Sequence, residues 1–281
     1  MKENKPCDDR FACFVQKLNF SGLTGTKIIF WLAAIMIASF VIGFGILAVT
    51  DGLSGTSPGK STPFRHGSML SPNITAIPLD GAAAGRIGIT MGAGELSLSE
   101  GAPAGTLAEV TVFSRAPEWQ PEYSQSLNGT IKALAITDPG HRGKEWFSVD
   151  SPNRWDIRVT DQVPVELSVA LGAGDSTLDL NGLTLKRLSV SNGAGETTID
   201  LGRYSKSPFT ADIHNGIGDL TIRIPRTSST RISVHQGVGD IDAKGLVQHD
   251  EYYSTNSYNP SLPANEILIN QGVGDISIET V

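Results

Sequence analysis

The longest apolar stretch of the chain runs from Ile28 to Val49 and contains no charged residue. A helix rises about 1.5 Å per residue, so a stretch of this length can cross a hydrocarbon core of about 30 Å. The pattern therefore predicts a transmembrane helix at 28–49. A cleaved signal peptide is the alternative, but its apolar segment is usually shorter, its leading segment is smaller, and no clear A-x-A cleavage site follows here.

Lys and Arg are distributed unequally around this helix. More of them precede it than follow it: Lys2, Lys5, Arg10, Lys17 and Lys27 against Lys60 and Arg65. Positive residues favour the cytoplasmic side, so we expect a cytoplasmic tail at 1–27 and an extracytoplasmic C-terminal part. Membrane lipid would hold the protein in the cell membrane through this single-pass anchor. Residues 50–80 are rich in Gly, Ser, Thr and Pro without hydrophobic periodicity, which predicts a flexible stalk.

One tetrapeptide pattern, Gly-x-Gly-Asp/Glu, recurs through the remaining residues, 81–281. Four of the six copies follow one another at spacings of 21, 23 and 21 residues, a period that suits one coil of a solenoid. The glycines are Gly92 and Gly94, Gly172 and Gly174, Gly193 and Gly195, Gly216 and Gly218, Gly237 and Gly239, and Gly272 and Gly274.

Apolar residues stand at fixed offsets around each copy. Five positions before the second glycine, every copy has a β-branched residue: Ile89, Val169, Val190, Ile213, Val234 and Ile269. Seven positions before it and four positions after it, every copy is again apolar. Even steps place side chains on one face of a strand, so each repeat reads as strand, Gly-x-Gly turn, strand. We expect an all-β, parallel β-solenoid whose coils stack at about 4.8 Å, with the Ala, Ile or Val between the glycines pointing into the core.

Two longer gaps interrupt the repeat and predict a β-rich insertion at about 101–160 and a loop at 244–265. In the first gap, apolar and polar residues alternate at Leu107–Phe113 and Trp155–Val159, which predicts two strands, and Asn128-Gly129 is suited to a hairpin turn. An aromatic group gathers there: Trp119, Tyr123, Trp146, Phe147 and Trp155. It could cover an open end of the solenoid or form a binding face. The second gap contains Tyr252, Tyr253 and Tyr258, which are candidates for contact with a partner, although a surface loop can also have no such role.

Composition excludes several classes of protein. The formal net charge of −7, without a concentrated basic face, argues against binding of nucleic acid. Cys7 and Cys13 both precede the apolar segment, so no disulfide is expected in the repeat region; they read as free thiols, with lipidation or metal binding as the alternatives. Asn73 and Asn128 fit the N-glycosylation pattern, which is short and often occurs by chance.

The repeat resembles the toast-rack domains of prokaryotic envelope proteins, including LiaF-like cell-envelope stress proteins and adhesin-type β-solenoid domains. The resemblance covers about 84–281 and rests on the Gly-Ala-Gly-Asp/Glu copies, on Val163–Leu167 running into Leu171–Asp175, and on Leu180–Leu185. It implies a right-handed, single-sheeted β-solenoid without catalytic residues, which serves for interaction or sensing. LiaF-like proteins carry several membrane helices, whereas this chain has one predicted helix.

The acidic residue of each copy is the main candidate for chemistry in the repeat: Glu95, Asp175, Glu196, Asp219, Asp240 and Asp275. Stacked carboxylates repel one another, and a bound cation such as calcium would relieve the repulsion. Alternatively, each carboxylate accepts hydrogen bonds from turn amides and faces water, which this longer period favours. His214 and His235 occupy equivalent places in repeats that follow one another in the sequence, so we expect them to stack on the outward face.

No nucleophile with an adjacent base and no metal-ligand spacing is apparent, so we expect neither an enzyme nor a cofactor. The expected function is that of a non-enzymatic, membrane-anchored interaction scaffold or sensor of the cell-envelope stress type. Its partner would be an unknown envelope protein or surface polymer. The alternative is a surface adhesin or a structural protein that self-associates through solenoid edges.

Overall fold

The computed structural model describes residues 72–114, 120–139, 153–204 and 208–281. The predicted tail, the predicted transmembrane helix at 28–49 and most of the predicted stalk lie outside these ranges. Within the described ranges, no helix is long and apolar enough to cross a membrane.

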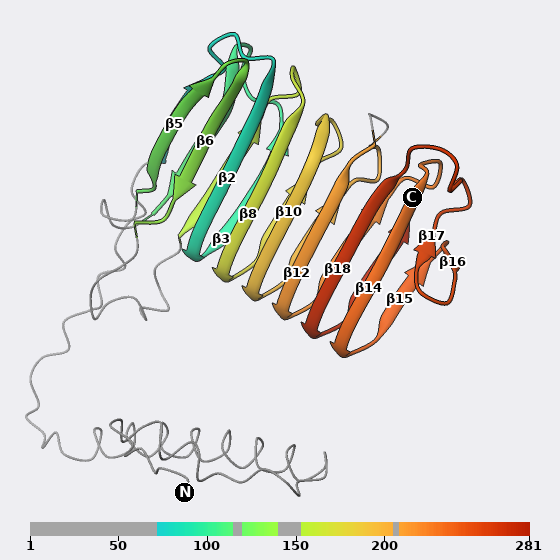
Figure 1. Cartoon of the computed structure of the whole chain (residues 1–281). Helices are drawn as coiled ribbons and strands as arrows, with labels where there is room; N and C mark the ends of the chain where they lie inside the picture. The colour runs from blue at the N-terminus through green and yellow to red at the C-terminus, as the bar shows by residue number, and fades with distance from the viewer. Residues whose placement is uncertain (1–71, 115–119, 140–152, 205–207) are drawn as a thin grey trace, which may run out of the picture. The chain divides into compact units, whose positions relative to one another are not determined.

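The strands form two sheets. The nine-stranded sheet contains, in order, β1 (Asn73–Pro78), β4 (Thr106–Phe113), β7 (Arg154–Val159), β3 (Glu95–Glu100), β9 (Ser176–Asp179), β11 (Thr197–Asp200), β13 (Leu220–Ile224), β19 (Ile276–Thr280) and β15 (Ile241–Lys244). The ten-stranded sheet contains β16 (Val247–Gln248), β17 (Tyr253–Ser254), β14 (Thr230–Val238), β18 (Asn265–Val273), β12 (Thr210–Ile217), β10 (Leu185–Ala194), β8 (Val165–Ala173), β2 (Ala84–Ala93), β6 (Ile131–Thr137) and β5 (Glu122–Asn128). Figure 1 shows the ten-stranded sheet with its strands side by side.

Each Gly-x-Gly turn joins the two sheets. The strand before the turn lies in the ten-stranded sheet and the strand after it lies in the nine-stranded sheet, as in β8 and β9. Neighbouring repeats pair in parallel, with Val169 opposite Val190 and Leu178 opposite Ile199. The stacked, parallel repeats confirm the expected coils, but the single sheet that the resemblance implies is replaced by two mixed sheets, because the turn sends the second strand of each repeat across the core. The right-handed sense of the coil stays a prediction.

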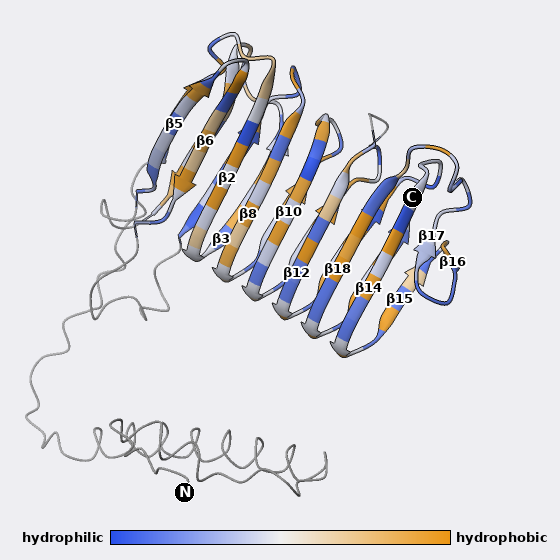
Figure 2. Cartoon of the chain, in the orientation of Figure 1, coloured by the Kyte–Doolittle hydropathy of each residue, from blue (hydrophilic) through white to orange (hydrophobic). Residues whose placement is uncertain are grey.

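The apolar residues at even offsets fill the space between the sheets. Ile89, Val169, Val190, Ile213 and Ile269 are all buried, and so are the residues four positions after the second glycine in five of the six copies. Outward positions on the same strands are more polar, and Figure 2 shows this alternation as hydrophobic and hydrophilic bands along the strands. Burial of one face of each strand is what the period of two predicts.

The residue between the two glycines is not in the core, contrary to the expectation. Ile217, Val273 and Val238 are 62%, 47% and 66% exposed. The reason is the bend of the chain at the second glycine, where φ is 127° at Gly174 and 136° at Gly239. The bend places the preceding residue on the outer edge of the turn instead of between the sheets.

The glycines allow the turns of neighbouring coils to touch backbone to backbone. A Cβ atom on Gly172 would lie 2.4 Å from the carbonyl oxygen of Gly92, and one on Gly174 would lie 1.9 Å from that of Gly94. Real Cβ atoms do not approach an oxygen so closely. The second glycine also has a positive φ that side chains disfavour, so both position and conformation require glycine.

The coils do not stack in the order of the sequence. β18 of the last repeat lies between β12 and β14, which is visible in Figure 1 as a deep red strand between two orange ones. Pairing of His214 with Asn270 and of Asn270 with His235 follows from this order. The expected stacking of His214 directly on His235 is therefore wrong, because the chain returns after β17 and inserts its last coil between theirs.

The predicted insertion at 101–160 supplies further strands at the other end of the stack. β6 and β7 extend the solenoid by pairing in parallel with β2 and β3, and β4 and β1 add antiparallel strands beyond β7. The predicted strands at Leu107–Phe113 and Trp155–Val159 are confirmed as β4 and β7, and the predicted hairpin at Asn128-Gly129 joins β5 to β6. Because β1 begins at Asn73, the folded part starts before the predicted boundary between stalk and domain at 80/81.

Substitution of Gly174 tests the backbone contact between turns. We expect Gly174→Ala to lower the free energy of unfolding by about 3 kcal/mol or more, because the new Cβ would overlap the Gly94 carbonyl at an unfavourable φ. Gly88→Ala is the matched control, since a Cβ there meets only the Leu134 oxygen at 4.0 Å. Denaturant unfolding should show the control within about 1 kcal/mol of the parent, and equal losses in both variants would contradict the contact.

Candidate functional site

The acidic residues of the repeat form a ladder on the outer side of the turns. In stacking order they are Glu95, Asp175, Glu196, Asp219, Asp275 and Asp240. Carboxylates in this ladder accept hydrogen bonds from backbone amides of the next coil. Oδ1 of Asp175 accepts from the N–H of Glu196 at 2.9 Å, and Oδ1 of Asp219 accepts from the N–H of Asp275 at 3.0 Å.

The same contact recurs between the last two coils, where Oδ1 of Asp275 accepts from the N–H of Asp240 at 3.0 Å. These bonds are the turn-amide contacts of the second sequence-based alternative. Within the described ranges, no three His, Cys, Asp or Glu side chains converge as a metal site requires. His214 instead lies 3.0 Å from Asp212 on its own strand.

A second ladder, of amide side chains, lies inside the turns and was not recognised from the sequence. One position before the first glycine, the inward residue changes along the stack: Met91, Leu171, Asn192, Asn215, Gln271 and Gln236. The amide nitrogens donate to turn carbonyls, from Asn215 to Gly218 at 2.9 Å and from Gln236 to Gly274 at 2.7 Å. The recurrence of Asn or Gln at one fixed position in four repeats was the signal that could have revealed it.

The structure describes two residues of the aromatic group in the insertion, Tyr123 and Trp155. Trp155 on β7 is fully buried, and its indole N–H donates to Oδ1 of Asn153 at 3.0 Å. Tyr123 on β5 packs against the core, and burial raises the pKa of its phenol. Both therefore contribute to covering the β5 and β6 end of the core. Trp119, Trp146 and Phe147 lie outside the described residues.

The 244–265 segment folds back onto the stack at its opposite end. β17 pairs antiparallel with β14, with Tyr253 opposite Ile232. The ring of Tyr252 is enclosed on two sides, because His249 stacks on it at 4.3 Å and the guanidinium of Arg231 lies 4.5 Å from its centroid. Tyr258 meets Tyr252 edge to face. The tyrosines proposed as partner contacts are thus held together with the end of the solenoid, and their role in binding stays a prediction.

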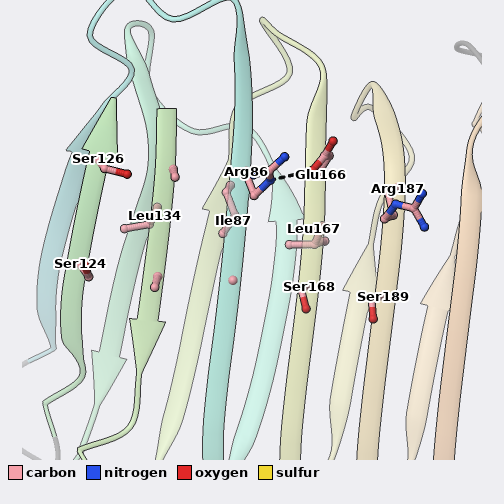
Figure 3. Close-up of a pocket in the computed structure, with 13 residues that line it drawn as sticks. Arg86, Ile87, Ser124, Ser126, Leu134, Glu166, Leu167, Ser168, Arg187 and Ser189 are labelled. Carbon is pink, nitrogen blue, oxygen red and sulfur yellow. Dashed lines mark hydrogen bonds and ion pairs between the residues drawn. The ribbon is translucent and has the colours of Figure 1, made fainter. Parts of the chain in front are cut away.

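A groove of about 490 Å³ lies on the ten-stranded sheet over β5, β6, β2, β8 and β10. Figure 3 shows it from the open side, with Ser124 and Ser126 on β5 and Ser168 and Ser189 on β8 and β10. Small residues keep the surface hollow, and they are Gly88, Ala133, Ala135, Ser168 and Ser189. Because the groove is built on hydrogen-bonded strands, its shape is fixed by the sheet.

A row of charged side chains crosses one part of the groove. Nε of Arg86 donates to Oε2 of Glu166 at 2.8 Å, and the two side chains are 59% and 42% exposed. Arg187 on the next strand is exposed and has no ion-pair partner among the described residues. The lining residues include no histidine and no cysteine, so the groove offers hydroxyl, guanidinium and carboxylate groups for binding but no nucleophile with a base.

Comparison with known proteins places these features in a family. Residues 67–223 match the family described as the N-terminal domain of toast_rack, DUF2154. A crystal structure of a "putative cell adhesion protein" from Clostridium sporogenes is similar, with 26% identity and a TM-score of 0.71, over 75% of this chain and 99% of that one. A "putative adhesin" from Bacteroides fragilis shares 14% identity, with a TM-score of 0.31, over 80% of this chain and 100% of that one. The comparison with curated proteins found no match.

Removal of one carboxylate tests the acidic ladder. We expect Asp275→Ala to lower the free energy of unfolding by about 1 kcal/mol, because the N–H of Asp240 loses its acceptor. Asp240→Ala is the control, since β15 is the last strand of its sheet and no further coil of the described chain donates to its carboxylate. Chemical unfolding that ranks the two variants the other way would contradict this role of the ladder.

A calcium titration tests the cation alternative for the same ladder. We expect the thermal midpoint of the full chain to stay unchanged on addition of calcium, because turn amides already satisfy these carboxylates. A midpoint that rises with calcium concentration, and stops rising in Asp275→Ala, would instead establish a bound cation.

Proposed function

Because the chain belongs to the toast-rack family, we propose that it is a non-enzymatic protein of the cell envelope that serves as an interaction or adhesion module. The groove on the ten-stranded sheet is the observation that carries this proposal. It presents serine hydroxyls, the Arg86–Glu166 pair and Arg187 on a preformed surface. Surfaces of this kind bind through complementarity and hydrogen bonds, without a chemical step.

The groove favours a ligand that is extended and flat. Its floor of Gly88, Ala133, Ala135 and small serines lets another chain approach the sheet closely. The serine hydroxyls can donate and accept hydrogen bonds, and Arg187 has its donors free for an acidic or hydroxyl-rich group. A segment of another envelope protein or a surface polymer meets these requirements. The similarity to the Clostridium sporogenes protein supports adhesion as one form of this function.

In the proposed arrangement, the helix at 28–49 anchors the protein in the cell membrane and the solenoid projects on the extracytoplasmic side. The asymmetry of Lys and Arg around that segment supports this orientation. A sensor of the cell-envelope stress type would use the same groove, with ligand occupancy as its input. This finer role rests on the resemblance to LiaF-like proteins.

Filling the groove tests the proposal. We expect Ser168→Tyr, which places a bulky ring in the groove, to weaken binding of the full-length protein to isolated cell-envelope material by about tenfold or more. Thr177→Tyr is the matched control, because Thr177 belongs to the same coil but is exposed on the other sheet. Co-sedimentation with envelope fractions measures the binding of both variants and of the parent protein.

The two variants should unfold at the same temperature as the parent, so that a loss of binding reports on the groove and not on folding. Equal binding by both variants and the parent would reject the groove as the contact surface. A change in the cell's envelope-stress response with Ser168→Tyr alone would support the sensor role, and an unchanged response together with lost binding would favour adhesion.

A further inference from the structure

The coil of Gly237 is the last of the stack and has an incomplete edge. β15 ends the nine-stranded sheet, with β19 as its single neighbour. In the ten-stranded sheet, β17 pairs with β14 only at Arg231 and Ile232. The stretch from Ser233 to Val238 therefore has β18 on one side and no strand of the described chain on the other. At the opposite end of the stack, the antiparallel strands β4 and β1 extend one sheet and β5 extends the other beyond the parallel coils.

Backbone groups on this edge point away from the stack. The carbonyl of Ser229 accepts a hydrogen bond from the N–H of Asn265 of β18, whereas the carbonyl of the next residue, Thr230, accepts one from the N–H of Thr255 on the β17 side. Backbone N–H and C=O groups alternate between the two sides of a strand. Val234 and Gln236 accordingly turn theirs to the open side, as Thr230 does toward β17, whereas Ser233 and His235 face β18. Unpaired backbone N–H and C=O groups therefore form a row along this edge, which continues the line of the two-residue strand β17.

The core is also open at this edge. Ile241 is 36% exposed and Val234 is only partly buried, whereas their counterparts Ile276 and Ile269 in the next coil are buried. A pocket of about 560 Å³ lies over both residues and extends between them and the segment from Gln248 to Tyr253. Side chains of an added strand would therefore find an apolar floor beside the free backbone groups.

The rim of this pocket is acidic. Asp250 and Glu251 line it, are exposed, and form no ion pair within the described part of the chain. The nearby cations are already engaged, because Arg231 lies over Tyr252 and Lys244 contacts Asp242 at 2.9 Å. A ligand that places positive charge at this rim would be attracted to two unpaired carboxylates.

We propose that the free edge of β14, from Ser233 to Val238, binds an extended segment of a partner protein that adds one strand to the ten-stranded sheet. The segment carries apolar side chains at alternate positions, which cover Val234 and Ile241, and a Lys or Arg that pairs with Asp250 or Glu251. Main-chain hydrogen bonds to Val234 and Gln236 supply affinity, and the alternating side chains supply selectivity. This site is separate from the groove and adds a second mode of binding to the proposed function.

Proline at Gln236 tests the backbone contact without removing a main-chain hydrogen bond to β18. Edge strands tolerate proline where the N–H faces outward. Full-length protein in detergent would be panned against a phage library of random dodecapeptides, and an enriched peptide would be measured by fluorescence anisotropy. We expect enrichment of alternating apolar sequences with Lys or Arg, with binding about tenfold weaker in Gln236→Pro and unchanged in Gln236→Ala, which loses the same side-chain amide but keeps the N–H.

Two further variants keep the test decisive if Gln236→Pro does not fold. Ile241→Lys puts a positive charge on the exposed apolar floor, and Glu251→Lys reverses one charge of the acidic rim. Each variant should bind the selected peptide about tenfold more weakly. Ser168→Tyr should leave peptide binding intact, which distinguishes failure of this site from failure of the groove. The proposal is overturned if no alternating peptide is enriched, if Gln236→Pro and Ile241→Lys bind normally, or if the edge is occupied by a second copy, seen as a dimer that Gln236→Pro dissociates.

Discussion

The fold depends on the direct contact of backbone with backbone where the Gly-x-Gly turns stack. The carbonyl oxygen of one turn occupies the place that a Cβ of the next would need, at 2.4 Å for Gly193 over Gly172 and 2.0 Å for Gly195 over Gly174. Parallel strands can keep their spacing of about 4.8 Å up to the bend only if both turn positions lack side chains. The two sheets then continue on either side of a common edge, and their inner faces enclose Ile199, Val190 and their equivalents.

Polar side chains reinforce this edge from both sides. Outside, aspartates such as Asp219 accept the N–H of the following coil, and inside, amides such as Asn215 and Gln236 hold the turn carbonyls. Buried backbone groups at a bend would otherwise lack partners. The acid that first suggests a metal ligand is therefore part of the hydrogen bonding of the turn, and the two surfaces that we propose for binding lie elsewhere, on the ten-stranded sheet and at its open edge.

The sequence was sufficient for the local structure and insufficient for the arrangement of the coils. β-Branched residues at even offsets, such as Ile89 and Val169, predicted strands and their buried face correctly, because burial imposes a period of two. The exposure of Val238 was missed because alternation stops where the chain bends. The stacking order of the coils could not be read from spacing, since Gly272, which lies over Gly216, and Gly237, which lies over Gly272, meet the same steric requirement.

The candidate sites were predicted less well, because they depend on neighbours that are distant in the sequence. Gly88 and Ser168 read as ordinary strand residues until β2 and β8 are placed beside β6. The tyrosines of the 244–265 segment were recognised as a group, but their enclosure by Arg231 depends on the return of the chain to β14.

The position of β18 and β19 between coils that precede them in the chain has a consequence for folding. A solenoid whose coils stack in order can grow by adding each repeat to the one before it. Here the coil of Gly237 has no permanent neighbour until the last seventeen residues, 265–281, have been synthesised, because its own place next to the Gly216 coil belongs to them. Completion of the stack is therefore an insertion that closes a long loop, and both sheets require residues 265–281 for it.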